Sequence, residues 1–267
     1  MSTRFRRSLS TLGCPALSLD EALALAERHG INALELRTLE GTMDIPALFG
    51  RNGEEAVRRV QRLHGTVQVL ALSPSFKLVR PSETDCAALL SYVPWAEALW
   101  VPWLRIFDCG EVSDSGTIPL AAETPRWWRQ LRSKHGWKVD VMVETHDGLV
   151  THEAIRRYCL QAKDVAMLWD ARNTWRKTGV YPVVLWPRIA EYVVHIHVKD
   201  SIGRASERLP YTFVLPGDGE FPMRRLADGL RRDGYASAVS LEWERQWHPN
   251  LPPIEMALQT AANRGWW

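Results

Sequence analysis

Four side chains that can bind metal ions stand at the ends of apolar segments in the second half of the chain. They are Glu144, Asp170, His197 and Glu242. The interval is 26 residues from Glu144 to Asp170, 27 from Asp170 to His197 and 45 from His197 to Glu242. The first two intervals each match about one strand–helix unit, so the four side chains are expected together at the ends of neighbouring strands.

Three carboxylates held close together repel one another, and a bound divalent cation removes that repulsion. Three oxygen ligands and one imidazole favour Mn²⁺ or Mg²⁺, while Co²⁺ and Zn²⁺ stay open. Any one of these residues alone could instead cap a helix or form a salt bridge at a strand end. Four in register predict a metal site made by Glu144, Asp170, His197 and Glu242.

The elements that must position these residues alternate between strand and helix along the chain. The expected strands are Ser8–Leu12, Ile31–Leu36, Thr66–Leu72, Leu104–Phe107, Lys138–Val143, Asp164–Trp169, Val193–Val198 and Ala238–Trp243. Expected helices include Glu54–Leu63, Ser82–Trp100, Pro125–His135, Thr151–Gln161, Trp186–Tyr192, Pro222–Arg232 and Pro253–Ala262. A longer irregular connection is expected before Trp186, and another long connection over Ser201–Glu220.

Eight such units in 267 residues predict an α/β protein that forms a single (β/α)8 barrel over residues 1–267. The alternative is an open, doubly wound sheet. That fold would carry a glycine-rich phosphate-binding turn after its first strand. The sequence Gly13-Cys14-Pro15-Ala16 at that place is not such a turn.

Composition narrows the function classes. The formal net charge is +2, which argues against a nucleic-acid partner because such proteins carry a strong basic excess. No apolar window approaches the 18 or so residues of a membrane span, so we expect no membrane partner. The four widely spaced cysteines and the interrupted apolar segment after Arg7 lead us to expect a cytoplasmic protein.

Several motifs together resemble those of the xylose isomerase-like TIM-barrel superfamily. They are Glu144-Thr145-His146, Leu168-Trp169-Asp170, His195-Ile196-His197-Val198-Lys199-Asp200, Leu215-Pro216-Gly217-Asp218-Gly219 and Leu241-Glu242, with a weaker match at Arg105-Ile106-Phe107. The similarity is strongest to sugar and sugar-phosphate isomerases and epimerases of the tagatose/psicose 3-epimerase and inosose dehydratase kind. It implies a divalent metal held by the four residues above. It also implies that Glu144 and Glu242 flank a sugar and move protons.

Five further residues are expected to contact the substrate. They are His146, Lys199, Arg172, Asn173 and Arg105. Relatives commonly place a histidine where this chain has Asn173, and an amide can hydrogen-bond a hydroxyl but cannot carry a proton at neutral pH. Arg172 could bind a carboxylate or phosphate, or form an exposed salt bridge. His195 is expected to be a hydrogen-bonded core residue.

The expected function is isomerisation or epimerisation of a sugar, sugar phosphate or related polyhydroxy carbonyl compound. The reaction would move a proton beside the carbonyl through an ene-diolate that a bound cation stabilises. An inosose-type dehydratase on the same site is the first alternative. A metal nuclease of the endonuclease IV kind and a catalytically inactive ligand-binding barrel are the others. The expected partners are a small-molecule sugar or sugar phosphate and a further copy of the chain in a homo-oligomer.

Overall fold

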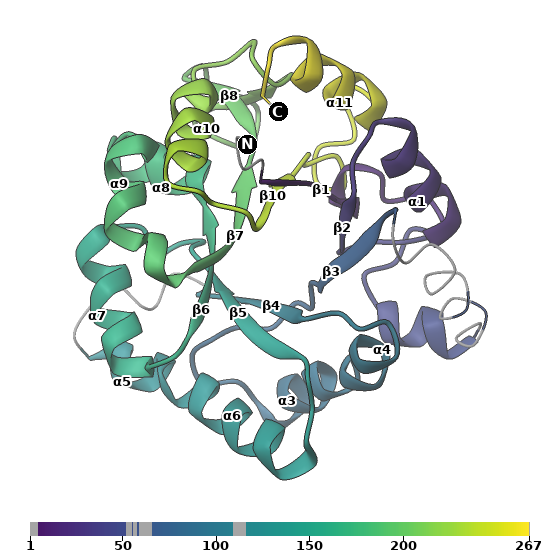
Figure 1. The fold of residues 1–267 in the computed structure, drawn as a ribbon, viewed down its shortest axis with the longest axis vertical. Helices are drawn as coiled ribbons and strands as arrows, with labels where there is room; N and C mark the ends of the chain where they lie inside the picture. Colours follow the sequence, from purple (N-terminus) through teal and green to yellow (C-terminus); the bar gives the residue numbers. More distant parts are fainter. Residues whose placement is uncertain (1–4, 52–54, 56–57, 59–65, 109–115, 267) are drawn as a thin grey trace.

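The computed structural model describes residues 5–51, 55, 58, 66–108 and 116–266. Eight parallel strands close into a barrel, and the helices form a ring around it (Figure 1). The barrel strands are β1 (Arg6–Ser10), β2 (Ala33–Leu36), β3 (Gln68–Leu72), β4 (Trp103–Phe107), β5 (Asp140–Glu144), β6 (Ala166–Asp170), β7 (Val193–Val198) and β10 (Ala238–Leu241). Their order around the barrel is β1-β10-β7-β6-β5-β4-β3-β2, which confirms the expected (β/α)8 fold.

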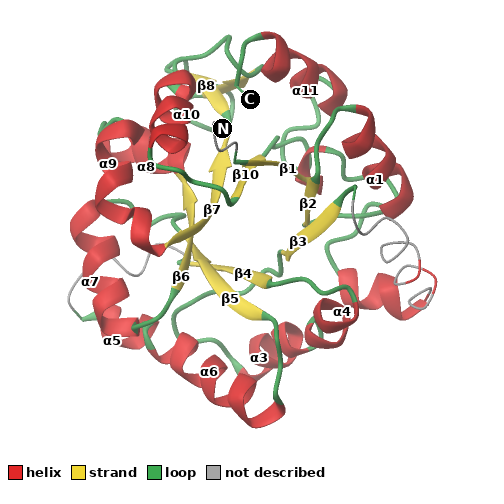
Figure 2. Ribbon diagram, viewed as in Figure 1, coloured by secondary structure: helices red, strands yellow, loops and turns green. Residues whose placement is uncertain are grey.

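Helices cover the outside of this barrel (Figure 2). They are α1 (Leu19–Arg28), α3 (Glu83–Leu90), α4 (Val93–Ala98), α5 (Thr117–Ala121), α6 (Glu123–His135), α7 (His152–Ala162), α8 (Ala171–Thr178), α9 (Pro182–Ile189), α10 (Met223–Arg232) and α11 (Ile254–Asn263), with short 3₁₀ turns η1 (Thr11–Gly13) and η2 (Ala190–Tyr192). Most of the helix expected over Glu54–Leu63 lies outside the described residues.

The irregular connection expected before Trp186 was wrong, because α8 follows β6 without a break. The reason is local. The Asp170 side chain accepts a hydrogen bond from the Asn173 backbone N–H at 2.8 Å, which caps the first turn of α8. The helix ends at Gly179, which takes the left-handed conformation that glycine permits.

Tryptophan side chains fill much of the space between barrel and helices. Trp128, Trp169, Trp243 and Trp266 are among the largest fully buried side chains of the described residues. The rings of Trp169 on β6 and Trp186 on α9 stack with centroids 6.0 Å apart, which fixes α9 against the barrel.

The long connection after β7 contains an antiparallel hairpin, β8 (Asp200–Ile202) and β9 (Thr212–Val214). The buried Asp200 carboxylate accepts hydrogen bonds from the backbone N–H groups of Ser201, Gly217, Gly219 and Phe221, at 2.8 to 3.0 Å. One carboxylate therefore fastens both ends of this insertion next to β7. Among the helices described, none is long and apolar enough to cross a membrane.

Candidate functional site

Glu144, Asp170, His197 and Glu242 meet at the carboxyl-terminal end of the barrel. One potential ligand atom from each lies within 4.8 Å of the others. Glu144 and Asp170 are the last residues of β5 and β6, His197 lies near the end of β7, and Glu242 directly follows β10. The side chains of all four are buried, with Glu242 the most exposed at 5 %. The strand ends thus bring together the four residues that the sequence singled out.

Several buried polar atoms of this group lie in ion-pair contact with neighbouring side chains but make no aligned hydrogen bond in the described part of the chain. They are both carboxylate oxygens of Glu144, Asp170 Oδ2 and His197 Nδ1. His197 Nδ1 lies 3.3 Å from Glu144 Oε1 and 3.4 Å from Glu242 Oε1. Buried polar atoms rarely lack aligned hydrogen bonds, and three carboxylates around one imidazole nitrogen form a donor set that suits a divalent cation. The residues present therefore fit such an ion.

The two oxygens of Asp170 have separate tasks. Oδ1 accepts the hydrogen bond from the backbone of Asn173 that caps α8. Oδ2 lies 3.0 Å from Lys199 Nζ and makes no aligned hydrogen bond in the described part of the chain. The helix cap thus holds the carboxylate in the orientation that presents Oδ2 to a cation.

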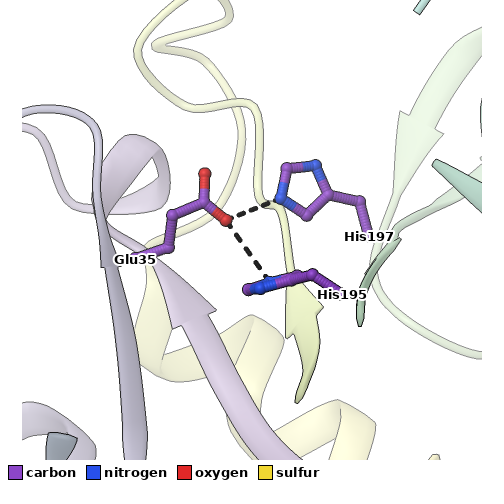
Figure 3. A group of neighbouring side chains, drawn as sticks. All are labelled: Glu35, His195 and His197. Atoms are coloured by element: carbon purple, nitrogen blue, oxygen red, sulfur yellow. Dashed lines mark hydrogen bonds and ion pairs between the residues drawn. The ribbon is translucent and has the colours of Figure 1, made fainter. Parts of the chain in front are cut away.

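The carboxylate of Glu35 on β2 points towards His197 and His195 (Figure 3). Its Oε2 is 2.6 Å from His197 Nε2 and 3.6 Å from His195 Nε2, and its Oε1 accepts a hydrogen bond from Ser73 Oγ at 2.7 Å. Because an ionised carboxylate only accepts, His197 Nε2 donates a proton to Glu35, and Nδ1 is turned towards Glu144 and Glu242. Sequence reasoning missed Glu35.

His195 lies deeper in the barrel and is 1 % exposed. Its Nε2 is 2.7 Å from Ser240 Oγ on β10. Burial lowers the pKa of His195 to about 4, so the ring is neutral at physiological pH. The structure agrees with the expectation of a hydrogen-bonded core histidine.

The charges of this group shift one another's pKa values. Burial by itself lowers the pKa of His197, but the negative charges of Glu242 and Glu35 raise it well above its usual range. Burial by itself raises the pKa of Glu144. The positive charge of Arg105 and the contact with His197 outweigh burial, so the pKa lies well below its usual range. In the same way His197 and Lys199 hold the pKa of Glu242 well below its usual range. Both glutamates are therefore ionised.

Two cations neutralise part of this negative charge. Arg105 Nε lies 2.5 Å from Glu144 Oε2. Lys199 Nζ contacts Glu242 Oε2 and lies 2.7 Å from Glu244 Oε1. Glu244 was not expected from the sequence. It lies in the loop after β10, two residues beyond Glu242, and burial raises its pKa.

A cavity of about 460 Å³ opens over the group. Its lining includes Arg37, Arg105, Phe107, Glu144, His146, Asp147, Asn173, Lys177, Lys199, Leu209, Tyr211, Phe213, Glu242 and Glu244. Four of the five residues expected to contact the substrate are in this lining, namely His146, Lys199, Asn173 and Arg105. A volume of this size accommodates a small polyhydroxy compound.

Arg172, the fifth expected contact, is not among the residues that line the cavity. Its side chain is 1 % exposed, and its Nε and one terminal nitrogen donate hydrogen bonds to Ser201 Oγ at 3.0 and 2.7 Å. The guanidinium carbon lies 3.7 Å from the ring centroid of Tyr211 and 5.1 Å from that of Phe213. Arg172 therefore stabilises the β8–β9 connection through cation–π contacts with Tyr211 and Phe213.

One protein-family model and several solved structures are similar to this chain. The family model described as xylose isomerase-like TIM barrel matches residues 118–264. No curated protein sequence matches the chain significantly. Among solved structures, the probable 3-DHS dehydratase AsbF from Bacillus anthracis superposes with a TM-score of 0.79 at 16 % identity, over 97 % of this chain and 100 % of that one.

Two further structures are similar over nearly their whole length. The IolI protein with a bound zinc atom gives a TM-score of 0.70 at 16 % identity, over 98 % of this chain and 96 % of that one. A xylose isomerase domain protein from Planctomyces limnophilus gives 0.67 at 15 % identity, over 99 % of each chain. The family model covers more than half of the sequence, and the chain belongs to the xylose isomerase-like TIM-barrel family.

Proposed function

We propose that this protein is a divalent-metal-dependent enzyme that moves a proton next to the carbonyl group of a small polyhydroxy compound. One observation carries the proposal. Four ligand atoms from Glu144, Asp170, His197 and Glu242 lie within 4.8 Å of one another at the end of the barrel where such enzymes hold their active sites. A divalent cation held there would stabilise the negative charge that develops on the substrate oxygens.

The chain's own carboxylates are suited to proton transfer. Glu144 and Glu242 come from β5 and from the end of β10, with β6 and β7 between them in the barrel. Both line the cavity, and both are ionised, which is the state of a proton acceptor. We infer that one removes the proton from the carbon beside the carbonyl and that a protonated group returns it to the neighbouring carbon or the opposite face.

The remaining polar residues of the cavity would orient the substrate. His146 and Asn173 can hydrogen-bond to hydroxyl groups, and Lys199 can stabilise a developing alkoxide. His146 Nδ1 is 2.9 Å from Asp147 Oδ2, and the charges of Glu144 and Asp147 raise the pKa of His146 although burial opposes this shift. His146 is therefore a candidate donor of the returning proton.

Dehydration is the second candidate reaction, since it shares the first proton transfer. When a hydroxyl group stands on the next carbon, the electron pair can expel it, and a donated proton leaves with it as water. The likeness to the AsbF dehydratase supports this alternative through the fold alone. Asn173 favours it as well, because the amide removes a proton carrier that the resemblance led us to expect for epimerisation.

Two measurements test the proposal in order. A calorimetric Mn²⁺ titration of chelator-treated protein is expected to show one tight site per chain. The Mn²⁺-loaded protein is then incubated in deuterated water with a panel of ketoses and inososes, and the masses of the products are measured by mass spectrometry. Deuterium gain without loss of water indicates isomerisation or epimerisation, and loss of water indicates dehydration. Absence of metal binding at millimolar Mn²⁺ would overturn the proposal.

We also expect a small-molecule substrate rather than a nucleic acid as the partner. Plasmid nicking by the metal-loaded protein, which a nuclease would show, is expected to be absent. A cytoplasmic location and a homo-oligomer remain expectations from the sequence.

A further inference from the structure

We propose that the substrate of this cavity carries an anionic group, a carboxylate or a phosphate, which binds to Arg37. This inference rests on the proposed function, because it identifies a property of the substrate at the same site. Arg37 directly follows β2 and lines the cavity. Sequence reasoning gave it no role.

Arg37 differs from the other cationic side chains of the cavity in its pairing. Arg105 lies 2.5 Å from Glu144, Lys177 lies 2.6 Å from Asp147, and Lys199 lies 2.7 Å from Glu244. Within the described chain, no carboxylate oxygen is found within ion-pair distance of Arg37. The other cations therefore already form an ion pair with a carboxylate. Arg37 can bind an anion without breaking such an ion pair.

The hydrogen bonds of Arg37 hold it in place without neutralising it. One terminal nitrogen donates to the backbone oxygen of Ser73 at 2.9 Å, and the other donates to Ser75 Oγ at 2.8 Å. The backbone N–H of Arg37 donates to Thr11 Oγ1 at 2.9 Å. A guanidinium has five N–H groups, so two of them are used by the loop after β3 and the others remain for a ligand.

Burial makes this unpaired charge costly. Arg37 is 9 % exposed, and burial together with the positive charge of Arg105 lowers its pKa to about 10, so it stays protonated at neutral pH. Glu144 and Glu35 act on this cation electrostatically without forming an ion pair with it, and a buried cation without such a pair is stabilised when an anion binds to its remaining N–H groups. A guanidinium suits carboxylate and phosphate because its fixed donors match two oxygens of either group.

The position of Arg37 also fits a substrate that spans the barrel. In the strand order, β2 stands four strands from β6 in either direction, and the two strands lie on opposite sides of the barrel (Figure 1). Arg37 directly follows β2 and Asp170 is the last residue of β6. A ligand with its anionic group at Arg37 can extend across the cavity and place its hydroxyl and carbonyl groups near Glu144 and Glu242.

The test compares three five-carbon probes that differ in charge: ribitol, D-ribonate and D-ribitol 5-phosphate. Each is titrated calorimetrically into wild-type protein after chelator treatment and again with Mn²⁺ added. At least one of the two anions is expected to bind about tenfold more tightly than ribitol, in both forms of the protein. Preference for ribonate identifies a carboxylate, and preference for the phosphate ester identifies a phosphate.

Variants decide whether Arg37 is responsible. In Arg37→Gln the preference for the anion is expected to fall to about that of ribitol, while Arg37→Lys keeps part of it. The exposed Arg188→Gln on α9 is the control and is expected to bind all three probes as the wild type does. Equal binding of anions and ribitol, no binding of either anion, or an unchanged preference in a folded Arg37→Gln protein would each overturn the inference. Because the metal-free protein is measured as well, these results do not depend on whether the proposed reaction occurs.

Discussion

Glu35 Oε2 and His197 Nε2 are 2.6 Å apart, although 162 residues separate them in the sequence. This hydrogen bond ties β2 to β7 across the interior of the barrel. It fixes the ring orientation of His197 and leaves Nδ1 facing Glu144 and Glu242. A carboxylate in this place also makes the imidazole a stronger metal ligand.

Replacing Glu35 by Gln is therefore expected to weaken metal binding while preserving the fold, since the two side chains have nearly the same shape. Mutations of such supporting residues typically reduce metal affinity by about ten- to a hundredfold. Calorimetric Mn²⁺ titration measures the loss. Ser73→Ala, which removes only the hydrogen bond to the other oxygen of Glu35, is expected to have a smaller effect. Equal affinities in Glu35→Gln and wild type would refute the supporting role.

Metal affinity is expected to rise with pH. The raised pKa of His197 means that the ring is an imidazolium in the metal-free protein near neutral pH, so a cation must displace its proton. Raising the pH removes this competition, and the affinity should increase by up to about tenfold per pH unit while one proton is released. Mn²⁺ titrations in two buffers of different ionisation enthalpy would show the released proton. A flat pH profile would contradict a protonated His197.

His197→Ala should abolish tight Mn²⁺ binding. Among the four proposed ligands Glu144, Asp170, His197 and Glu242, His197 alone supplies a nitrogen. Circular dichroism would establish that the variant folds. His195→Ala is not a neutral control, since His195 also contacts Glu35. The better control is His248→Ala, a residue of the cavity rim outside the metal-binding group. It should bind Mn²⁺ as the wild type does.

Glu242→Gln is expected to keep the barrel but to stop deuterium exchange into any substrate found, because the amide cannot accept a proton. The rate should fall by at least about a hundredfold. Full metal loading is to be verified for the variant, since Glu242 is also a proposed ligand. Exchange at the wild-type rate in the loaded variant would remove Glu242 from the mechanism.

Gly219→Ala should destabilise the protein. A Cβ there would lie 2.2 Å from Asp200 Oδ1 and 2.8 Å from the Ser201 backbone oxygen, so the loop or the carboxylate must move. We expect a loss of about 1–3 kcal/mol in the free energy of unfolding, measured by urea denaturation. Gly50→Ala is the matched control, because a Cβ there, in the helical stretch of residues 45–51, meets nothing within 4 Å. Similar effects of the two changes would show that the Asp200 loop is not tightly held.

The sequence was most informative about polar residues that stand at the end of an apolar strand. Glu144, Asp170, His197 and Glu242 could be found because each closes an apolar run, and the regular spacing of β/α units places such ends together. Glu35 could not, because it lies inside the alternating segment Ile31–Leu36, where a polar residue is expected to face outwards. Only barrel closure reveals that it points inwards.

Two other features depended on contacts that no local pattern contains. Helix α8 was missed because capping and metal binding were weighed as alternatives for Asp170, although its Oδ1 caps the helix while Oδ2 stays available to a cation. Arg37 was overlooked because what distinguishes it is that no described carboxylate lies within ion-pair distance of it, and this depends on how distant segments pack around the cavity.

Asp200 holds both ends of the β8–β9 insertion in place. Sequence changes within the insertion are therefore separated from changes in the barrel strands. Leu209, Tyr211 and Phe213 form one wall of the cavity, yet they lie between anchor points that a single carboxylate holds in place. The stretch between those anchors can change in sequence or length without disturbing β7 or His197. We therefore expect this insertion to differ more between members of the family than Glu144, Asp170, His197 and Glu242 do.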